Sequence, residues 1–333
     1  MGRMIKPTHS GLLPNRSLRQ DEVSLERSSA AFVAGVGCDL QLPSLFKGAI
    51  LGLKSVGLLN VGWSTEEGGT MLELYHSINS VCAQKVRIAL AEKELPYKEH
   101  LMTLGGDQFD PAYMKLNPNA VVPTLIHDGQ PIIESSVILY YLDEAFPEKS
   151  LMPVAPLARA TVRLFNKLID EYVHNSCTIL TFATAFRPGL LKMTPEEREA
   201  GFAKAPSKQR SAYKRDVVAH GLDSQFVKDA VEHHEKLLTW IDDAMKGGPY
   251  LAGDTYSLAD VAVIPYILRL ELLQLSRMWD KRPGVAAWWE RVRQRPSTGT
   301  AIFKRMAEPD TAPFKNLTPD PWPRVQEMLL GAA

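Results

Sequence analysis

The spacing of apolar residues becomes regular at Met71 and predicts a small αβ domain over residues 71–147. Short apolar runs of strand length alternate there with longer runs whose apolar positions recur with the period of a helix. The order of the runs is βαβ, then a short helix or turn, then ββα. Asp128-Gly129 lies between the last two strands, and this dipeptide is typical of a β-hairpin turn.

The chain downstream of this domain has helical spacing throughout. A proline-rich linker at residues 148–156 separates the two parts, and residues 308–333 form a C-terminal tail. Between them, residues 157–307 read as an α-helical bundle. Its first helix carries apolar residues on one face, as expected of a helix buried on one side: Val162, Phe165, Leu168 and Ile169.

Two of the predicted helices begin with a capping box. In this pattern a hydroxyl residue is followed three positions later by an acidic one, and the two side chains bond the free N–H groups of the first turn. Thr194 is followed in this way by Glu197, and Ser257 by Asp260. Both pairs therefore fix where a helix of the bundle starts.

Charge and cysteine content exclude several classes of function. The 333 residues contain 38 Lys or Arg and 38 Asp or Glu, so no net charge favours nucleic acid or an anionic membrane. Basic and acidic residues interleave from Lys192 to Arg215, which predicts a solvated face there. Cys38, Cys82 and Cys177 are too widely spaced for a zinc site or a disulfide framework. With no apolar run of membrane-spanning length, we expect a cytoplasmic protein with reduced thiols and no metal.

Residues 1–70 have a different pattern from the rest. The first 20 residues contain four basic residues and no acidic one, and a later run has helical apolar spacing over less than the length of a membrane span. We expect this N-terminal extension to be mobile or partly docked on the fold. A targeting peptide is one alternative, and a first residue of the protein assigned too far upstream is another.

Three stretches, in this order, resemble the soluble glutathione transferases: SVCAQKVRIALAEK, LNPNAVVPTLIHDGQPIIESSVILYYLDE and YLAGDTYSLADVAVIPYI. The resemblance covers residues 71 to about 305. It implies a thioredoxin-like domain followed by a helical bundle, usually as a homodimer. It also implies glutathione as cosubstrate, a small hydrophobic electrophile as the second substrate, and a role in detoxification or aromatic catabolism.

The second stretch contains the candidate glutathione-binding residues. Pro123 forces Val122 into an extended conformation and leaves the backbone of Val122 free to pair with an extended ligand. In the family this proline is cis, and the residue before it binds the cysteinyl part of glutathione. Glu134 is placed to pair with the ammonium group of the γ-glutamyl unit, and Ser135 to bind its carboxylate at a helix start. A turn proline and an ordinary helix cap are the structural alternatives.

The first stretch contains two candidate catalytic residues, Ser80 and Cys82. Lowering the pKa of the glutathione thiol by two units requires roughly 2.7 kcal/mol. One hydrogen bond to a charged group supplies about 1.5–3 kcal/mol, so a single hydroxyl is enough. The resemblance places Ser80 at the activating serine of the zeta, phi and theta-like classes, and Cys82 at the cysteine of beta-class members. The motif that begins at Cys82, C-A-Q-K, has no second cysteine, so it does not support a dithiol oxidoreductase of the thioredoxin kind but permits a mixed disulfide with glutathione.

We therefore predict a glutathione transferase that activates the thiol as a thiolate for attack on a hydrophobic, aromatic electrophile. Tyr172 and His174 are candidates for orienting that substrate. The insertion from Lys192 to about Asp229 resembles bacterial enzymes that dehalogenate hydroquinones or cleave β-aryl ethers, and such chemistry would use Cys82. A zeta-like cis-trans isomerase and a non-catalytic binding module are further alternatives.

Overall fold

The computed structural model describes residues 71–331. The predictions for residues 1–70 lie outside the described part of the chain. Within it, no helix is long and apolar enough to cross a membrane. Of the cysteines, Cys82 is half-buried and Cys177 is buried, and both are free thiols.

The first domain is a four-stranded mixed sheet with helices, in the predicted order βαβ-α-ββα. The strands are arranged β2-β1-β3-β4, with β1 parallel to β2 and antiparallel to β3, and β3 antiparallel to β4. The elements are β1 (Leu72–His76), α1 (Val81–Glu92), β2 (Lys98–Leu101), η2 (Asp107–Phe109), α2 (Pro111–Leu116), β3 (Thr124–His127), β4 (Gln130–Ile133), α3 (Ser135–Ala145) and η3 (Pro147–Lys149).

The second part is helical, as its apolar spacing predicts. Its longer helices are α4 (Pro156–Leu168), α5 (His174–Ala183), α7 (Pro195–Ala203), α8 (Lys208–His220), α9 (Val227–Ala244), α10 (Leu258–Leu272), α11 (Pro283–Arg293) and α14 (Trp322–Gly331). The shorter elements are η4 (Ile169–Val173), α6 (Arg187–Leu191), η5 (Gly221–Asp223), η6 (Ser276–Trp279), α12 (Pro296–Ala301), η7 (Phe303–Arg305), α13 (Glu308–Thr311) and η8 (Ala312–Phe314).

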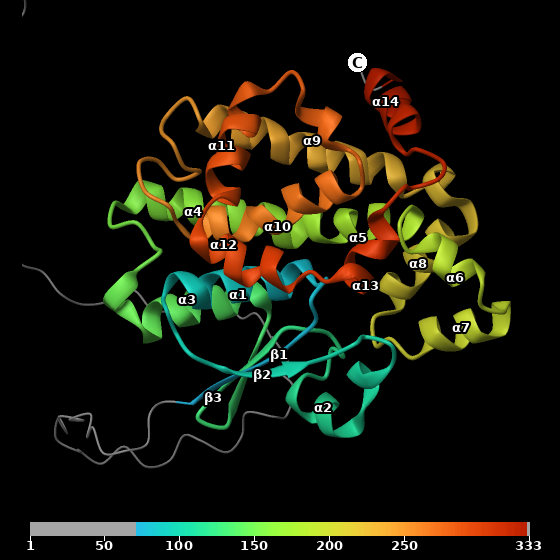
Figure 1. Cartoon of the computed structure of the whole chain (residues 1–333), viewed down its shortest axis with the longest axis horizontal. Coiled ribbons are helices and arrows are strands. Elements are labelled where there is room, and N and C mark those ends of the chain that lie inside the picture. Colours follow the sequence, from blue (N-terminus) through green and yellow to red (C-terminus); the bar gives the residue numbers. More distant parts are fainter. Residues whose placement is uncertain (1–70, 332–333) are drawn as a thin grey trace, which may run out of the picture. The chain divides into compact units, whose positions relative to one another are not determined.

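Helices α1 and α3 lie between the sheet and the helical part, and α1 lies next to α10 and α12 (Figure 1). Helix α1 is buried along almost its whole length, polar residues included, and it contacts α3 as well as α10 and α12. A single apolar core therefore runs from Leu74 of the sheet through Ile88 of α1 to Tyr266 of α10. The start of α1 is held between the two parts of the protein, where it meets α5.

Both predicted capping boxes are confirmed, at α7 and at α10. The box at α10 is buried. Asp260 accepts hydrogen bonds there from the backbone N–H of Ser257 at 2.9 Å, that of Leu251 at 3.1 Å and the indole N–H of Trp288 at 2.8 Å. This carboxylate thus joins the start of α10 to the loop before it and to α11.

Candidate active site at the start of α1

A cleft of about 2280 Å³ opens at the start of α1, between the sheet domain and helices α5, α6 and α8. All six site residues singled out from the sequence line it, on three separate segments of the first domain. They are Ser80, Cys82, Val122, Pro123, Glu134 and Ser135. The structure therefore brings together the candidate catalytic and candidate glutathione-binding residues.

Ser80 is the N-cap of α1, and its hydroxyl oxygen accepts a hydrogen bond from the backbone N–H of Ala83 at 3.2 Å. Capping uses only the acceptor side of the hydroxyl. The hydroxyl hydrogen stays available to donate to a sulfur anion in the cleft. The capping role and the proposed chemical role of Ser80 are therefore compatible.

Cys82 lies in the first turn of α1 beside two polar side chains of the helical part. Its Sγ is 3.5 Å from Nδ1 of His174 and 3.9 Å from Oη of Tyr266. Burial raises the pKa of the Cys82 thiol, but the positive charges of His174 and Lys85 outweigh it and lower this pKa to about 6. These neighbours therefore favour the thiolate form of Cys82.

Lys85 lies one turn further along α1 and its side chain is fully buried. Its Nζ is 3.5 Å from Oδ1 of Asp170 and 5.9 Å from the centre of the Tyr266 ring. The separation from Asp170 is long for an ion pair, so the ammonium charge is only partly balanced. The remaining positive charge acts on the thiolate of Cys82.

His174 owes its position to an irregularity in the helical part. The segment η4, a π-helical turn, joins α4 to α5 and ends immediately before His174. Such turns shift side chains by part of a helical turn and occur often at functional sites. The sequence singled out Tyr172 together with His174, but only His174 lines the cleft. Tyr172 is 41% exposed and contacts the ring of His233 instead, which fits the alternative of surface exposure.

The other side of the cleft is formed by the Val122-Pro123 loop and the start of α3. The Val122-Pro123 peptide bond is cis. Glu134 has a positive φ of 68° and is the N-cap residue of α3, without a side-chain cap for the helix. The first N–H groups of α3 are therefore left free at the cleft, beside the buried hydroxyl group of Ser135. Asn119 donates to the Glu134 carboxylate at 3.2 Å and holds it at the rim.

Comparison with known proteins identifies the family. The model of the glutathione S-transferase N-terminal domain matches residues 74–150, and that of the glutathione S-transferase C-terminal domain matches residues 210–296. The chain is 30% identical over 235 residues to glutathione S-transferase TCHQD of Arabidopsis thaliana, which amounts to 68% of this chain and 87% of that protein. The chain belongs to the glutathione S-transferase superfamily.

Two further members of the superfamily have other reactions in their names. Tetrachloro-p-hydroquinone reductive dehalogenase of Sphingobium chlorophenolicum is 28% identical over 239 residues, 69% of this chain and 95% of that protein. The crystal structure of β-etherase LigF from Sphingobium sp. strain SYK-6 matches with a TM-score of 0.63 at 27% identity, over 70% of this chain and 99% of that one. The predicted resemblance and fold are confirmed, and the relatives support glutathione chemistry in general rather than one reaction.

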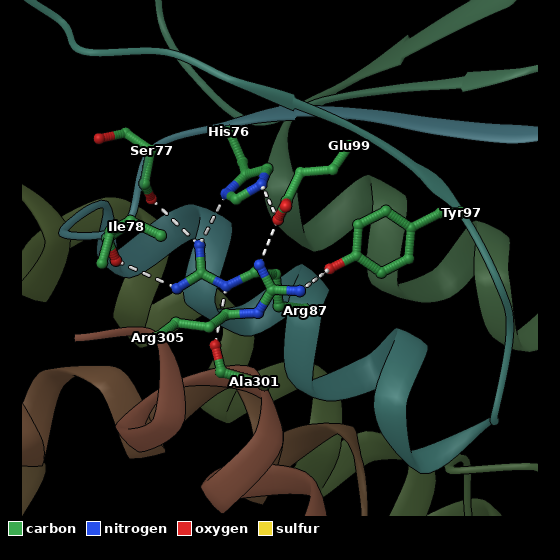
Figure 2. A network of polar contacts seen from close by, with 8 residues as sticks. All are labelled: His76, Ser77, Ile78, Arg87, Tyr97, Glu99, Ala301 and Arg305. Carbon is green, nitrogen blue, oxygen red and sulfur yellow. Dashed lines mark hydrogen bonds and ion pairs between the residues drawn. The ribbon is translucent and has the colours of Figure 1, made fainter. Parts of the chain in front are cut away.

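A buried arginine, Arg87, holds the loop before α1 by hydrogen bonds to its backbone (Figure 2). Arg87, which is only 1% exposed, donates to the carbonyl groups of Ser77 at 3.1 Å and Ile78 at 3.0 Å. It also donates to the carbonyl of Ala301, at the end of α12, at 2.8 Å, and to Nδ1 of His76 at 3.0 Å. One side chain thus connects β1, the loop before Ser80 and the helical part.

The same network reaches the edge strand β2. Burial and the charge of Arg87 lower the pKa of His76 to about 4, so this imidazole is neutral at neutral pH. Its Nδ1 accepts from Arg87 and its Nε2–H donates to the carboxylate of Glu99 at 2.7 Å. Arg305 also belongs to this network, because it donates to the carboxylate of Glu99 and to the hydroxyl of Tyr97 (Figure 2).

A second buried arginine holds the loop from the helical part. Arg269 of α10 donates to the carbonyl of Asn79 at 2.6 Å and to the hydroxyl of Thr181 in α5 at 3.1 Å. The side-chain amide of Asn79 in turn donates to the carbonyl of Asp310 at 2.9 Å. Three consecutive carbonyl groups before Ser80 are therefore bonded by arginines. The backbone that carries Ser80 and Cys82 is fixed from both parts of the protein.

Tyr266 and Arg269 escaped the sequence analysis, although a signal was present. Both lie in the strongly apolar run of α10, and a buried tyrosine or arginine needs polar partners. Burial, together with the charge of Cys82, raises the pKa of Tyr266 well above its ordinary value. Its hydroxyl therefore keeps its proton and is able to donate to a sulfur anion.

Proposed function

We propose that this protein is a glutathione-dependent enzyme in which Cys82 removes the glutathionyl group from a thioether of a small molecule. The observation that carries the proposal is the position of the Cys82 sulfur in the first turn of α1, 3.5 Å from Nδ1 of His174 and in the same cleft as Glu134 and Ser135. A thiolate in the first turn of a helix, with a partly balanced lysine next to it, is an activated nucleophile.

Glutathione would bind along the first domain. Its γ-glutamyl carboxylate would accept hydrogen bonds from Ser135 and the free N–H groups of α3, and its ammonium group would pair with Glu134. Its cysteinyl backbone would pair with Val122. This placement directs the glutathione sulfur to the start of α1, where Ser80 and Cys82 lie.

The reaction would proceed by attack of the Cys82 thiolate on the sulfur of a glutathione thioether. A disulfide bond forms between Cys82 and glutathione, and the sulfur–carbon bond breaks with its electron pair left on the carbon. That carbon takes a proton, which His174 is placed to supply. The carbon must stabilise negative charge, for example next to a carbonyl group or as a ring carbon of a hydroquinone in its keto form.

A second glutathione, as thiolate, would then attack the mixed disulfide. Glutathione disulfide leaves and the Cys82 thiolate is restored. In total, one thioether and one glutathione give the reduced product and glutathione disulfide, so the two-electron reduction of the carbon is balanced by oxidation of two glutathione sulfurs. The dehalogenase among the relatives is named for a reduction of this kind.

Conjugation by a serine-stabilised thiolate is the second candidate function. It is favoured by the free hydroxyl hydrogen of Ser80 at the start of α1, which could stabilise the thiolate of bound glutathione. The two steps are also compatible in one enzyme, with conjugation to an aromatic electrophile first and removal of the glutathionyl group second. An isomerase or a non-catalytic module would make no use of the Cys82 thiolate. A homodimer, a cytoplasmic location and a role in detoxification or aromatic catabolism stay predictions from the resemblance.

The proposed function predicts that Cys82 ionises near pH 6. Thiolate absorbance in the ultraviolet should be followed against pH, and the curve of Cys82→Ser subtracted to isolate this thiol. Cys177 does not interfere, because burial raises its pKa to about 11. His174→Phe removes the charge and the hydrogen bond next to the sulfur, so it should move the Cys82 transition upward by about one pH unit. A wild-type transition at pH 8 or above would contradict the proposal.

The proposed glutathione site makes a separate prediction about affinity. Glu134→Gln and Ser135→Ala should each weaken glutathione binding, measured by calorimetry, by about tenfold. The first removes the negative charge that pairs with the ammonium group, and the second removes a hydrogen bond to the carboxylate. Glu144→Gln is the matched control, since Glu144 is exposed on the same helix and lies outside the cleft. Equal affinity of the Glu134→Gln/Ser135→Ala double variant and the wild type would show that glutathione binds elsewhere.

A further inference from the structure

The cleft continues beyond Cys82 along one face of α5. His174, Thr178 and Phe182 line it on successive turns of this helix. At 1.5 Å per residue, the backbone at Phe182 is about 12 Å further into the helical part than the backbone at His174. The far end of the cleft, at Phe182, is therefore separated from the reacting groups at His174 by about the length of an aromatic molecule.

Two cations of α8 line the far end of the cleft. Arg210 and Lys214 are one turn apart and half-buried, and Nζ of Lys214 is 4.4 Å from the centre of the Phe182 ring. Within residues 71–331, neither forms an ion pair with a carboxylate. The adjacent Arg215 differs, because it points out of the cleft and forms an ion pair with Glu199 at 2.5 Å.

Most charged residues from Lys192 to Arg215 are exposed, as expected of a solvated face, but Arg210 and Lys214 depart from that pattern. Burial, together with the charge of Arg210, lowers the pKa of Lys214 to about 8. An ammonium group in this environment has less contact with water than a surface lysine, and no carboxylate of the described residues pairs with it. The aromatic ring of Phe182 offsets only part of that loss.

Two acids of the cleft are already bonded to another arginine. Asp223 and Glu327 also line the cleft, and both accept hydrogen bonds from Arg324, at 3.0 and 2.9 Å. Arg187, another cleft residue, is bonded to backbone carbonyl groups and to no carboxylate of the described chain. Arg187, Arg210 and Lys214 therefore line the cleft without a carboxylate partner in the described chain, next to aromatic side chains.

We propose that Phe182, Arg210 and Lys214 bind the carboxylate of an aromatic acid, and so select substrates whose anionic group lies at the opposite end from the reacting carbon. An aromatic ring would lie against Phe182, next to Phe186, which is 5.3 Å from it between ring centres. The carboxylate would supply the missing counter-ion of Arg210 and Lys214. The proposal rests on the proposed function for the reacting end, whereas the anion site is testable by itself.

The test compares two fluorescent probes that differ in one charged group. 8-Anilinonaphthalene-1-sulfonate has the anionic group, and N-phenyl-1-naphthylamine has the same rings without it. The full chain, without glutathione, should bind the sulfonate about tenfold more tightly than the neutral probe. Naphthalene-2-carboxylate should displace the sulfonate, and naphthalene-2-carboxamide should not.

Substitutions then assign the site. Arg210→Met and Lys214→Met should each weaken sulfonate binding by about tenfold and leave the neutral probe unchanged. Lys214→Arg keeps the charge and should retain most of the affinity. Lys208→Met is the matched control, because Lys208 is exposed on the same helix and outside the cleft.

Two outcomes would overturn the proposal. One is wild-type affinity for the sulfonate in the Arg210→Met/Lys214→Met double variant. The other is an equal loss for both probes, which would mean that the substitutions act on the aromatic wall and not on an anion site. Because no thiol takes part, a negative result for the Cys82 reaction leaves this measurement unaffected.

Discussion

Cys82→Ser is expected to reduce the release of acetophenone from S-phenacylglutathione by at least about 10³-fold, because an alcohol at this position is not ionised at neutral pH. This thioether is a suitable probe, since the carbon that leaves is next to a carbonyl group. With glutathione present, the wild type should produce one glutathione disulfide for each acetophenone. Both products are measured by chromatography.

Ser80→Ala is the matched variant for this experiment. It lies two residues away on the same helix start and removes the cap as well as the hydroxyl, but it leaves the Cys82 thiolate in place. We expect it to retain acetophenone release within about tenfold, since a lost cap costs about 1 kcal/mol. Mass spectrometry should also find glutathione on the peptide that contains Cys82. Full activity of Cys82→Ser together with an inactive Ser80→Ala would assign the chemistry to the serine and refute the cysteine mechanism.

Arg87→Met is expected to lower the free energy of unfolding by about 3–5 kcal/mol, as measured in urea. The substitution keeps a long apolar chain but leaves several buried acceptors without this donor, and each such group costs about 1–3 kcal/mol. The acceptors are the carbonyl groups of Ser77, Ile78 and Ala301 and the Nδ1 of His76.

Arg291→Met is the control for this measurement. The guanidinium of Arg291 is exposed and donates to one carbonyl group, that of Pro249. Its loss should cost less than about 1 kcal/mol. If Arg87→Met is no more damaging than Arg291→Met, the network in Figure 2 is not a major source of stability.

The parts of this structure that sequence predicted are those encoded by neighbouring residues. The spacing of apolar positions gave the order of strands and helices, and the pair Ser257 and Asp260 located the start of α10. The candidate site residues were found for the same reason. Ser80 and Cys82 lie at one helix start, and Glu134 and Ser135 at another, and each helix start has a local signature.

The environment of these residues was not predictable, because it depends on distant segments. Cys82 contacts His174 and Tyr266, which are 92 and 184 residues away. The position of His174 also depends on a π-helical turn, for which the apolar pattern gave no sign. The groups that favour the thiolate of Cys82 are thus brought to it by packing between the two parts of the protein, which the local sequence does not encode.

The basic residues of α8 show a different limit. Composition alone indicated a solvated face, since acidic residues interleave with them. Arg210 and Lys214 are four positions apart and therefore share one face of the helix, whereas Arg215 is turned away from them. Helical position, rather than local charge balance, decided which of them reach the cleft.

The position of α1 has a consequence for exchanging segments between relatives. Helix α1 packs against both parts of the protein: it contacts α3 within the first domain and α10 and α12 of the second. At its end, Glu92 accepts hydrogen bonds from Arg295, at 2.7 and 2.8 Å, and from Ser297. A chimera joined at the linker, residues 148–156, would separate α1 from the surface shaped to receive it. Recombination between superfamily members should therefore yield folded protein only when α1 and its partners in α10 and α12 come from the same parent.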